Sequence, residues 1–383
     1  MKSGRNWGRL GMTFETVTFE EITINYDKKR VPLSTKQRES IKGDYRYYGA
    51  QGVNDYIDDY IFDGKYLLIA EDGENLKSKK QNIAQLAEGK FWVNNHAHIV
   101  QCNSKCRIEY LCYLINSMDL SGYITGSAQP KLSQANINKI SFRIPTIEQQ
   151  DLILSVLIPI EKKINLNNQI NENLEQQAQA IFKSWFVDFE PFGGVMPEDW
   201  KIGMIKDIIE LHDSKRIPLS GSEREKMDKI YPYYGATSCM DYVDNYIFDG
   251  KYLLLGEDGT VIDKNGYPIL QYVEGKFWVN NHAHIITGKL GYTVEILYLL
   301  FKKTNVKHIV TGAVQPKISQ ANLKKVPVTI SSIKDLDAFN NIIQPIFAMI
   351  RKNRNENEKL ALLRDTLLPK LMNGEIDVSE VKI

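Results

Sequence analysis

Basic and aromatic residues in one stretch of this sequence could bind nucleic acid. The segment 27–46 carries seven basic and three acidic residues, a net charge of +4, and two tyrosines follow it directly. The segment 213–232 carries five basic and four acidic residues. Lysine and arginine bind phosphates, while polar side chains on loops read base edges. The candidate nucleic-acid-binding residues are Lys28, Lys29, Arg30, Lys36, Arg38, Arg46, Tyr47, Tyr48, Lys77, Lys79, Lys80, Lys215, Arg216, Tyr233, Tyr234 and Lys264.

A second pattern could support metal-dependent chemistry. Asp72 is followed at a distance by Glu88-Gly89-Lys90, and the same pattern recurs at Asp258 and Glu274-Gly275-Lys276. In metal-dependent nucleases two carboxylates hold Mg²⁺ and a lysine polarises the attacking water. The pattern is short, and Glu88-Gly89 also fits a turn before a strand. A Mg²⁺-dependent DNA nuclease that uses Asp72, Glu88 and Lys90 therefore stands as an alternative to a binding function.

The histidines form two His-x-His pairs, His96 with His98 and His282 with His284. Side chains two apart on a strand share a face, so each pair could bind one metal ion. No third ligand is evident near by in the sequence, which favours structural histidines that hydrogen-bond a loop. We therefore predict no metal site in this chain.

Motifs of the common enzyme classes are absent from the sequence. It contains no GxxxxGK[ST] phosphate loop, no GxGxxG, no G-x-S-x-G and no HExxH. It also lacks the Asn/Asp-Pro-Pro-aromatic run of amino-methyltransferases. We therefore predict that the chain has no catalytic residues.

The sequence contains an internal repeat whose two copies are separated by a constant offset. YIFDGKYLL at 60–68 is identical to 246–254, and EGKFWVNNHAH at 88–98 is identical to 274–284. No insertion or deletion separates the copies between positions 27 and 136. Within them, 74–87 faces 260–273 with almost no identity. One scaffold with two variable faces is more typical of a recognition module than of a duplicated catalyst.

Each copy is followed by apolar residues with a seven-residue period, which predicts a long helix. The first helix is expected over 159–185, 27 residues or roughly 40 Å. Asparagines in the middle of each stripe would fix the register of a helix pair, because a slipped pairing would bury an unpaired amide. A helix packed on its own domain is the alternative. The predicted pairing residues are Ile160, Ile164, Asn167, Asn171, Leu174, Ile181, Ile346, Ile350, Asn353, Asn357, Leu360 and Leu367.

Length and charge limit the possible partners. The chain has 383 residues, which is comfortable for two domains. Its 48 basic and 47 acidic residues give a net charge of +1, and a protein that holds nucleic acid alone is usually more basic. Partner proteins could supply the rest of the positive field. The sequence has no apolar run of membrane-spanning length and no apolar region typical of a signal peptide, so we expect a cytoplasmic protein.

Taken together, the motifs resemble the specificity subunit of a type I restriction-modification system. The resemblance covers nearly the full length, including Tyr-Tyr-Gly-Ala at 47–50, Glu-Asp-Gly at 71–73, Asn-Asn-His-Ala-His at 94–98 and Gln-Pro-Lys-Leu-Ser-Gln-Ala-Asn at 129–136. Leu-Pro-Lys-Leu-Met-Asn-Gly-Glu-Ile at 368–376 also fits. One departure lies at the entry to the second helix, where Ser331 and Lys334-Asp335 replace Pro and Glu-Gln.

The resemblance implies an α+β fold in which two similar target-recognition domains are separated by two long antiparallel coiled-coil helices about a pseudo-twofold axis. The expected parts are the first recognition domain (1–145), the first spacer helix (146–190), the second recognition domain (191–330) and the second spacer helix (331–383). Each domain would read one half of a bipartite site in double-stranded DNA, and the helices would set the gap.

The resemblance also implies the partners. Two modification subunits, which bind S-adenosylmethionine and methylate adenine, would dock on the helices, and restriction subunits would use ATP and Mg²⁺. This chain itself would hold no cofactor. An assembly scaffold that never touches bases is a further alternative.

Overall fold

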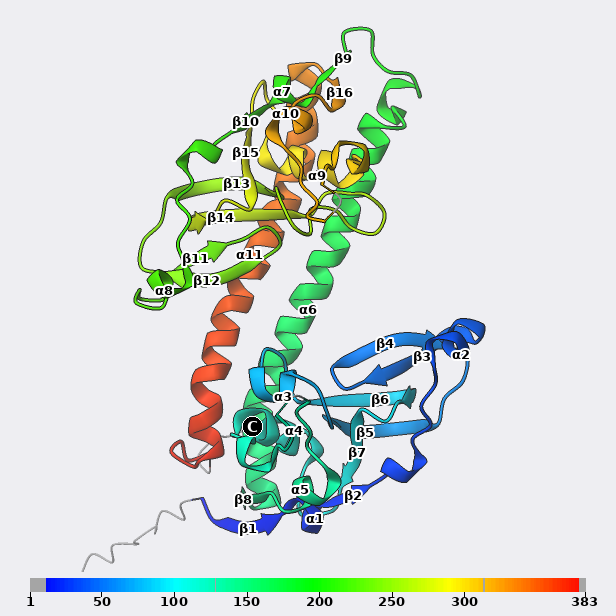
Figure 1. The fold of residues 1–383 in the computed structure, drawn as a ribbon, viewed down its shortest axis with the longest axis vertical. Coiled ribbons are helices and arrows are strands. Elements are labelled where there is room, and N and C mark those ends of the chain that lie inside the picture. The colour runs from blue at the N-terminus through cyan, green and yellow to red at the C-terminus, as the bar shows by residue number, and fades with distance from the viewer. Residues whose placement is uncertain (1–11, 128, 313, 379–383) are drawn as a thin grey trace, which may run out of the picture. The chain divides into compact units, whose positions relative to one another are not determined.

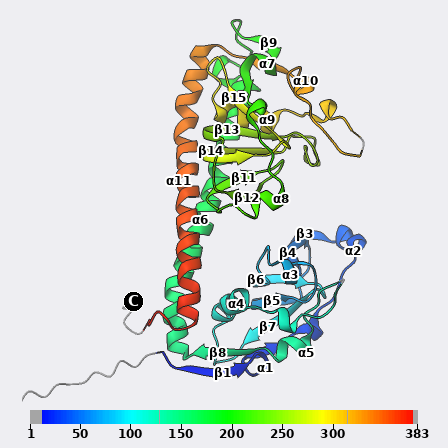
Figure 2. The ribbon, with the colours of Figure 1, turned by 60° about the vertical axis from the view of Figure 1, so that its left-hand side comes forward.

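The computed structural model describes residues 12–127, 129–312 and 314–378. The chain divides into two compact units, each with a mixed sheet, short helices and part of both long helices (Figures 1 and 2). Unit 1 is Met1–Asn165 with Glu356–Ile383, and unit 2 is Leu166–Asn355. The units group each helix segment with the domain that it packs against, so the four-part division expected from the sequence stays a prediction.

The central sheet of unit 1 has six strands in the order β2-β7-β5-β6-β3-β4. Neighbouring strands are antiparallel except β3 and β6, which are parallel. Strands β1 and β8 form a separate antiparallel pair. The strands are β1 (Phe14–Thr18), β2 (Thr23–Asn25), β3 (Lys42–Gly49), β4 (Gly52–Ile57), β5 (Phe62–Ala70), β6 (Ala84–Val93), β7 (Ala97–Cys102) and β8 (Ser141–Pro145). The helices are α1 (Phe19–Ile22), η1 (Asp27–Lys29), α2 (Thr35–Ser40), α3 (Asn75–Ser78), α4 (Ile108–Ser117), η2 (Ser121–Tyr123) and α5 (Gln134–Asn138).

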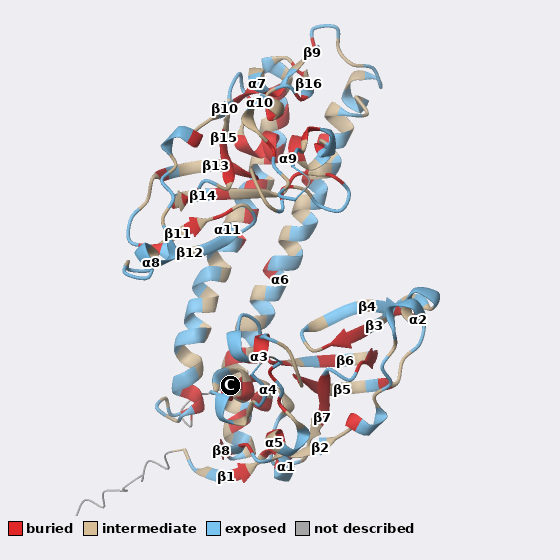
Figure 3. Ribbon diagram, in the orientation of Figure 1, coloured by how far each residue is buried: buried red, intermediate tan, exposed pale blue. Residues whose placement is uncertain are grey.

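Strand β5 lies in the middle of unit 1 because both of its faces are apolar (Figure 3). Leu67 and Ile69 enter the core that contains helix α4, while Leu68 enters a smaller core with Phe62 and Phe91 on the other face. Successive side chains of a strand point to opposite faces, so a continuous apolar run indicates a strand that is covered on both sides.

Unit 2 repeats this topology. Its six-stranded sheet has the order β10-β15-β13-β14-β11-β12, with β11 and β14 parallel, and β16 pairs with β9. The strands are β9 (Lys201–Met204), β10 (Ile209–Leu211), β11 (Tyr231–Tyr234), β12 (Cys239–Val243), β13 (Phe248–Gly256), β14 (Leu270–Val279), β15 (Ala283–Gly288) and β16 (Pro327–Ile330). The helices are η3 (Glu190–Phe192), α7 (Ile205–Ile208), η4 (Asp213–Lys215), α8 (Gly221–Arg224), α9 (Val294–Lys303), η5 (Lys307–Ile309) and α10 (Gln320–Leu323).

The strand expected after Glu88-Gly89 is present as part of β6, which begins earlier, at Ala84. The turn expected at Glu88-Gly89 was wrong, because Gly89 lies inside β6 opposite Gly64 of β5. Both glycines have positive φ, +83° and +126°, so this position of the strand pair uses a conformation that favours glycine. A glycine in the sequence suggested a turn, but the antiparallel pairing of β5 and β6 continues through this position.

The two long helices are α6 (Ile147–Phe186) and α11 (Ile333–Met372), each 40 residues or about 60 Å long. The start predicted at Pro159 was wrong, because α6 begins three turns earlier, at Ile147. The hydroxyl of Thr146 accepts a hydrogen bond from the N–H of Gln149 at 3.4 Å, which is the arrangement of a helix N-cap. Pro159 lies within the helix rather than at its first turn. Among the described residues, no helix is long and apolar enough to cross a membrane.

In unit 1 the segments of α6 and α11 lie side by side and antiparallel. Arg364 is 3.9 Å from Glu161, and the amide of Asn357 donates to the carbonyl oxygen of Ile164 at 3.4 Å. Residue numbers fall along α11 as they rise along α6, so the two segments are antiparallel. The start of α6 and the end of α11 also enter the main core of the unit.

In unit 2 the pairing is again antiparallel. The amide of Asn353 donates to the side-chain oxygen of Asn171 at 2.9 Å, and Asn171 donates to the carbonyl of Ile350 at 3.4 Å. The rings of Phe182 and Phe339 lie 5.9 Å apart. None of the predicted pairing residues is exposed: Asn167, Ile350 and Asn353 are buried, while Ile160, Ile164, Asn171, Leu174, Ile181, Ile346, Asn357, Leu360 and Leu367 are half-buried.

Candidate nucleic-acid interface

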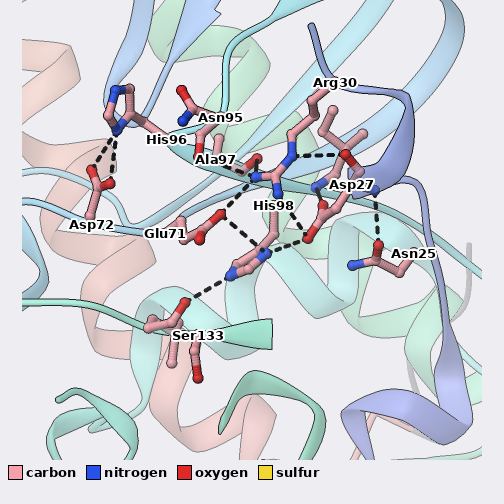
Figure 4. A network of polar contacts seen from close by, with 12 residues as sticks. Asn25, Asp27, Arg30, Glu71, Asp72, Asn95, His96, Ala97, His98 and Ser133 are labelled. Carbon is pink, nitrogen blue, oxygen red and sulfur yellow. Dashed lines mark hydrogen bonds and ion pairs between the residues drawn. The ribbon is translucent and has the colours of Figure 1, made fainter. Parts of the chain in front are cut away.

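A buried polar network lies where the end of β5 and the start of β7 meet η1 (Figure 4). The carboxylate of Asp27 is 2.6 Å from Nδ1 of His98 and accepts the backbone N–H of Ile99 at 2.8 Å. The other ring nitrogen of His98 faces the carbonyl oxygen of Leu132 at 2.8 Å. Both ring nitrogens of His98 therefore face an oxygen atom that can accept a hydrogen bond.

An arginine completes the network. The guanidinium of Arg30 donates to Glu71 at 2.7 Å and to the backbone carbonyls of Ala97 and Asn95 at 2.8 and 3.3 Å. The ammonium of Lys131 lies 3.2 Å from the other oxygen of Glu71. Arg30 and Lys131 therefore place positive charge beside the buried Asp27 and the half-buried Glu71, as charge removed from water requires.

The partners decide the charge state of both carboxylates. Burial opposes ionisation of Asp27, but the hydrogen bond and charge of His98 outweigh it and hold the pKa of Asp27 below its ordinary value. Burial likewise opposes ionisation of Glu71, and its pKa is lowered chiefly by the hydrogen bond from Arg30. Both groups are therefore carboxylates at neutral pH.

Unit 2 contains the same network with the same geometry. The ring of His284 lies 2.6 Å from the Asp213 carboxylate and 2.7 Å from the carbonyl oxygen of Ile318. Arg216 donates to Glu257 at 2.6 Å. The two copies, which differ in sequence at 74–83 and 260–269, thus keep one anchoring network.

The network has the residue types of a metal site but not its chemistry. Ligand atoms of Asp27, Glu71 and His98 lie within 4.8 Å of one another. Arg30 donates to Glu71 and lies 3.6 Å from Asp27, so a guanidinium supplies the positive charge that a metal ion would bring. The geometry assigns these residues to holding loops together.

The Mg²⁺-dependent nuclease is not supported. Asp72 bonds His96 in the loop after β5, whereas Glu88 faces Lys65 within the β5–β6 ladder. The ladder places Glu88 four positions from Ala84 at the end of β6, about 13 Å along the strand and away from Asp72. The ammonium of Lys90 lies over the ring of Tyr60, 4.5 Å from its centre. The three residues do not form a shared site.

Three loops meet beside the network in unit 1, at 71–73, at 94–96 and at the described residues of 125–131. Two backbone hydrogen bonds join the first loop to the others, at 2.9 and 3.1 Å. Gly126 has a φ of +86°, and a Cβ there would lie 2.2 Å from the carbonyl oxygen of Gln129, so the third loop requires glycine. We call these loops and their counterparts at 257–259, 280–282 and 311–317 the shared loops.

A segment of different sequence lies next to the shared loops in each unit. In unit 1, the segment 74–83 contains α3 and three exposed lysines, Lys77, Lys79 and Lys80, with one acidic residue. In unit 2, the segment 260–269 contains one lysine and one aspartate, and a bridge between Ile262 and Pro268 replaces the helix. We call 74–83 and 260–269 the variable strips.

The structure divides the predicted nucleic-acid-binding residues by exposure. The exposed ones could reach a ligand in solution, and those of the variable strips lie beside the shared loops. Lys36 lies on α2, which precedes the start of β3. The turn at the other end of β3 is the part that approaches Gly73, so Lys36 is at the opposite end of this strand from the shared loops. The exposed residues are Lys28, Lys29, Lys36, Arg46, Lys77, Lys79, Lys80, Lys215 and Lys264.

The other predicted residues have internal partners. Tyr47 is buried, its hydroxyl exchanges hydrogen bonds with the backbone of Leu33, and the Arg38 guanidinium stacks over its ring at 5.0 Å. Arg38 also pairs with Asp55. Such side chains position the sheet rather than a ligand. This group consists of Arg30, Arg38, Tyr47, Tyr48, Arg216, Tyr233 and Tyr234.

Sequence reasoning missed the exposed residues of the shared loops as candidate site residues. Asn95, Gln129 and Lys131 are exposed. Each has an identical counterpart in the second copy of the repeat. Identity between two copies, in a loop where packing does not require it, was the available signal.

A family model for the type I restriction modification DNA specificity domain matches the chain twice, at residues 12–176 and 197–362. The two matches cover most of the chain, one in each half. The chain belongs to this family. Specificity subunits recognise DNA sequence for type I restriction-modification systems and assemble with the other subunits, which carry the catalytic activities.

Individual relatives agree with this assignment. The type I restriction enzyme MjaIX specificity subunit of Methanocaldococcus jannaschii is 26% identical over 302 residues, which are 71% of this chain and 70% of that protein. A putative type I restriction enzyme specificity subunit of Haemophilus influenzae is 24% identical and covers 88% of this chain and 90% of its own length. The crystal structure of the type I S subunit from M. genitalium superposes with a TM-score of 0.63 at 14% identity, over 97% of this chain and 98% of that one, and therefore has the same fold.

Proposed function

We propose that each unit reads one half of a two-part DNA site and that its variable strip decides which bases are accepted. The shared loops would hold the phosphate backbone in the same way in both halves. The observation that carries this proposal is the position, in both units, of a strip whose sequence differs between the copies beside loops whose sequence is nearly the same. Contacts to phosphates position a protein on DNA, whereas base contacts specify the sequence.

Exchange of the variable strips tests this proposal. The segment 74–83 would be replaced by 260–269 within the full chain, assembled with its modification subunits. The buried anchors Leu76 and Ile83 correspond to Ile262 and Ile269, so the chimera keeps apolar residues in the core. We expect the half-site read by unit 1 to change, and the other half to stay the same, when methylated adenines are mapped across a genome.

A matched control changes a shared loop instead. Gln129→Ala, at an exposed position of 125–131, should leave both half-sites unchanged, because this loop would contact phosphates. A strip exchange that leaves the methylated sequence intact would refute the assignment of base reading to the strips. Altered sequence preference in the loop control would refute the division of roles.

We further propose that α6 and α11 set the gap between the two half-sites. Each helix begins in one unit and ends in the other. Insertion of one heptad into both helices, after Asn165 and after Asn355, adds about 10 Å to each. Duplex DNA rises about 3.4 Å per base pair, so the unread gap should grow by about three base pairs. A methylated site with its original gap would contradict this role.

The catalytic partners complete the proposal. Two modification subunits that use S-adenosylmethionine would dock on the helix pair and methylate adenine in each half-site, and restriction subunits would use ATP and Mg²⁺. The near-neutral charge of this chain supports shared DNA binding, since partners would supply the remaining positive field. DNA incubated with the methyl donor and the modification subunits should be methylated at the site only when this chain is added.

A further inference from the structure

Unit 1 contains an open cleft of about 600 Å³ between its sheet and the paired helices. Strand β6 and helix α4 form one wall, and segments of α6 and α11 form the other. The walls are mixed in character, with apolar side chains such as Leu86 and Cys112 beside the charged Lys65 and Glu109. A cleft of this size and composition is suited to a ligand with both apolar and charged parts.

The corresponding place in unit 2 is filled by that unit's own side chains. The rings of Tyr272, Tyr298 and Phe347 pack together with centres 5.6 to 6.2 Å apart. The guanidinium of Arg351 donates to the hydroxyl of Tyr272 at 3.0 Å and to Glu295 at 3.1 Å. When the two copies are aligned at the constant offset of the repeat, unit 1 has smaller or acidic residues at each of these four positions: Leu86 for Tyr272, Cys112 for Tyr298, Glu161 for Phe347 and Asn165 for Arg351.

The acceptor for the arginine is nevertheless kept in unit 1. Glu109 corresponds to Glu295, and Lys65 corresponds to Lys251. Glu295 pairs with Lys251, Tyr272 and Arg351, and its side chain is 2% exposed. Among the described residues, Glu109 is hydrogen-bonded to Lys65 alone, and its side chain is 21% exposed.

A second polar group lines the cleft. Tyr113 is buried there, and its hydroxyl lies beside the carboxylate of Glu161. Burial, and then the hydrogen bond and charge of Glu161, raise the pKa of Tyr113.

We propose that this cleft receives an arginine side chain of a modification subunit, in the way that the corresponding place in unit 2 holds Arg351. Arg351 shows which chemistry the retained acceptor takes: a planar guanidinium that bonds a carboxylate while its stem packs on apolar side chains. In unit 1 Glu109 would accept the guanidinium, and Leu86 and Cys112 would contact the stem. The choice of occupant rests on the proposed docking of modification subunits on the helix pair.

A small arginine derivative tests the chemistry of the cleft independently of any partner. The full chain would be titrated with N-acetyl-arginine amide and followed by nuclear magnetic resonance, with N-acetyl-lysine amide as the matched probe. A ligand of this size should bind with a dissociation constant on the order of 1 mM. The arginine probe should shift resonances of β6 and α4, and the lysine probe should bind at least ten-fold more weakly. Equal binding of both probes, or none of the arginine probe, would overturn the proposal.

Two variants locate the binding. Arg364 already lines the cleft, but it pairs with Asp365 and lies near Glu161. Asn165→Arg places a guanidinium at the position that corresponds to Arg351 and should abolish binding of the probe, whereas Glu109→Gln should weaken it at least ten-fold. Asp151→Asn on the exposed face of α6 should leave the affinity unchanged, because Asp151 pairs with Arg107 and does not line the cleft. If Asn165→Arg bound the probe as the parent does, the cleft would be the wrong site.

Assembly with modification subunits tests whether the arginine that enters the cleft comes from one of them. Asn165→Arg should weaken binding of modification subunits to the full chain at least ten-fold, and complexes formed at high concentration should methylate the same DNA site. Unchanged assembly, together with arginine-specific binding of the probe, would overturn the choice of a modification subunit. A changed half-site would instead contradict the proposed division of base reading.

Discussion

Units 1 and 2 share a topology and a buried network, yet they differ where the sheet meets the long helices. In unit 2 three aromatic rings and Arg351 fill that place. In unit 1 the same place is a cleft of about 600 Å³. Residues that hold the loops were kept in both copies, while residues that join the domain to the helices were not. The buried network is thus the same in both units, whereas the attachment of the sheet to the long helices is filled in unit 2 and open in unit 1.

The comparison has an energetic consequence. A cluster of buried rings and a hydrogen-bonded arginine stabilise the attachment of the sheet to the helices in unit 2. Unit 1 relies on the core formed by the start of α6 and the end of α11. Stability should therefore be more sensitive to substitution at the filled place than at the open one.

The largest effect is expected for Phe347→Ala in unit 2. Phe347 is buried against Tyr272 and Tyr298, so truncation leaves a cavity, and the free energy of unfolding should fall by about 4 kcal/mol. Glu161→Ala, the matched change in unit 1, should alter it by less than about 1 kcal/mol. Hydrogen exchange of β13 and β5 reports on the two units separately. Similar losses at both positions would remove the basis of the comparison.

The next effect is expected for Arg351→Ala. Its side chain bonds Glu295 and Glu274 and is 17% exposed, so its removal leaves the buried Glu295 with fewer partners. Loss of one partner of a buried ion pair destabilises by about 3 kcal/mol, and Lys251 should limit the effect to that size. Asn165→Ala is the control in unit 1 and should be close to neutral. Urea unfolding monitored by hydrogen exchange measures the loss of stability in each variant. Equal losses for Arg351→Ala and Asn165→Ala would contradict the prediction.

Substitution in either of the two buried networks should lower stability by the same amount, in contrast to substitution at the two attachments. The pKa values of Asp27 and Asp213 are held below 3.8 in the folded chain: burial opposes the shift, and the bonds to His98 and His284 outweigh it. Because the folded pKa is below the unfolded one, this stabilisation is full above about pH 4 and is lost as the pH falls through the folded pKa.

Replacement of either aspartate tests this equality. Asp27→Asn and Asp213→Asn should each lower the free energy of unfolding at pH 7 by about 2 kcal/mol, because each breaks a buried charged hydrogen bond. Each variant should also lose less stability between pH 4 and 2 than the parent does. Unequal effects of the two substitutions would show that the networks are not equivalent. Acid titration of hydrogen-exchange protection measures both quantities.

The repeat, the strands and the long helices could be predicted because each depends on local or periodic patterns. Two copies at one constant offset indicated two similar domains, and apolar residues with a seven-residue period indicated the two long helices. The start of α6 was misplaced because Pro159 looks like a first-turn proline. The cap at Thr146 lies well before it, and a proline inside a helix is compatible with a helix held by tertiary packing.

The candidate site was harder to predict because exposure depends on tertiary structure. Tyr47 and Arg38 look like ligand-binding residues in the sequence, but the fold buries the ring and stacks the guanidinium on it. The cleft in unit 1 could not be predicted from the sequence either. Its walls come from segments that lie far apart along the chain, and Leu86 and Asn165 are informative only beside Tyr272 and Arg351.

The smallest effect concerns the rebuilding of unit 2's attachment in unit 1. Leu86→Tyr and Asn165→Arg recreate the pair formed by Tyr272 and Arg351, with Glu109 as the acceptor. Leu86→Tyr alone adds a hydroxyl without the guanidinium, and Asn165→Arg alone has Glu109 but not the hydroxyl, so each should change stability little. Together they should show a favourable coupling of about 1 kcal/mol in a double-mutant cycle, because the new hydroxyl and guanidinium hydrogen-bond each other. Strictly additive effects would mean that the walls of the cleft are not arranged as they are in unit 2, and that the two attachments differ in backbone geometry as well as in side chains.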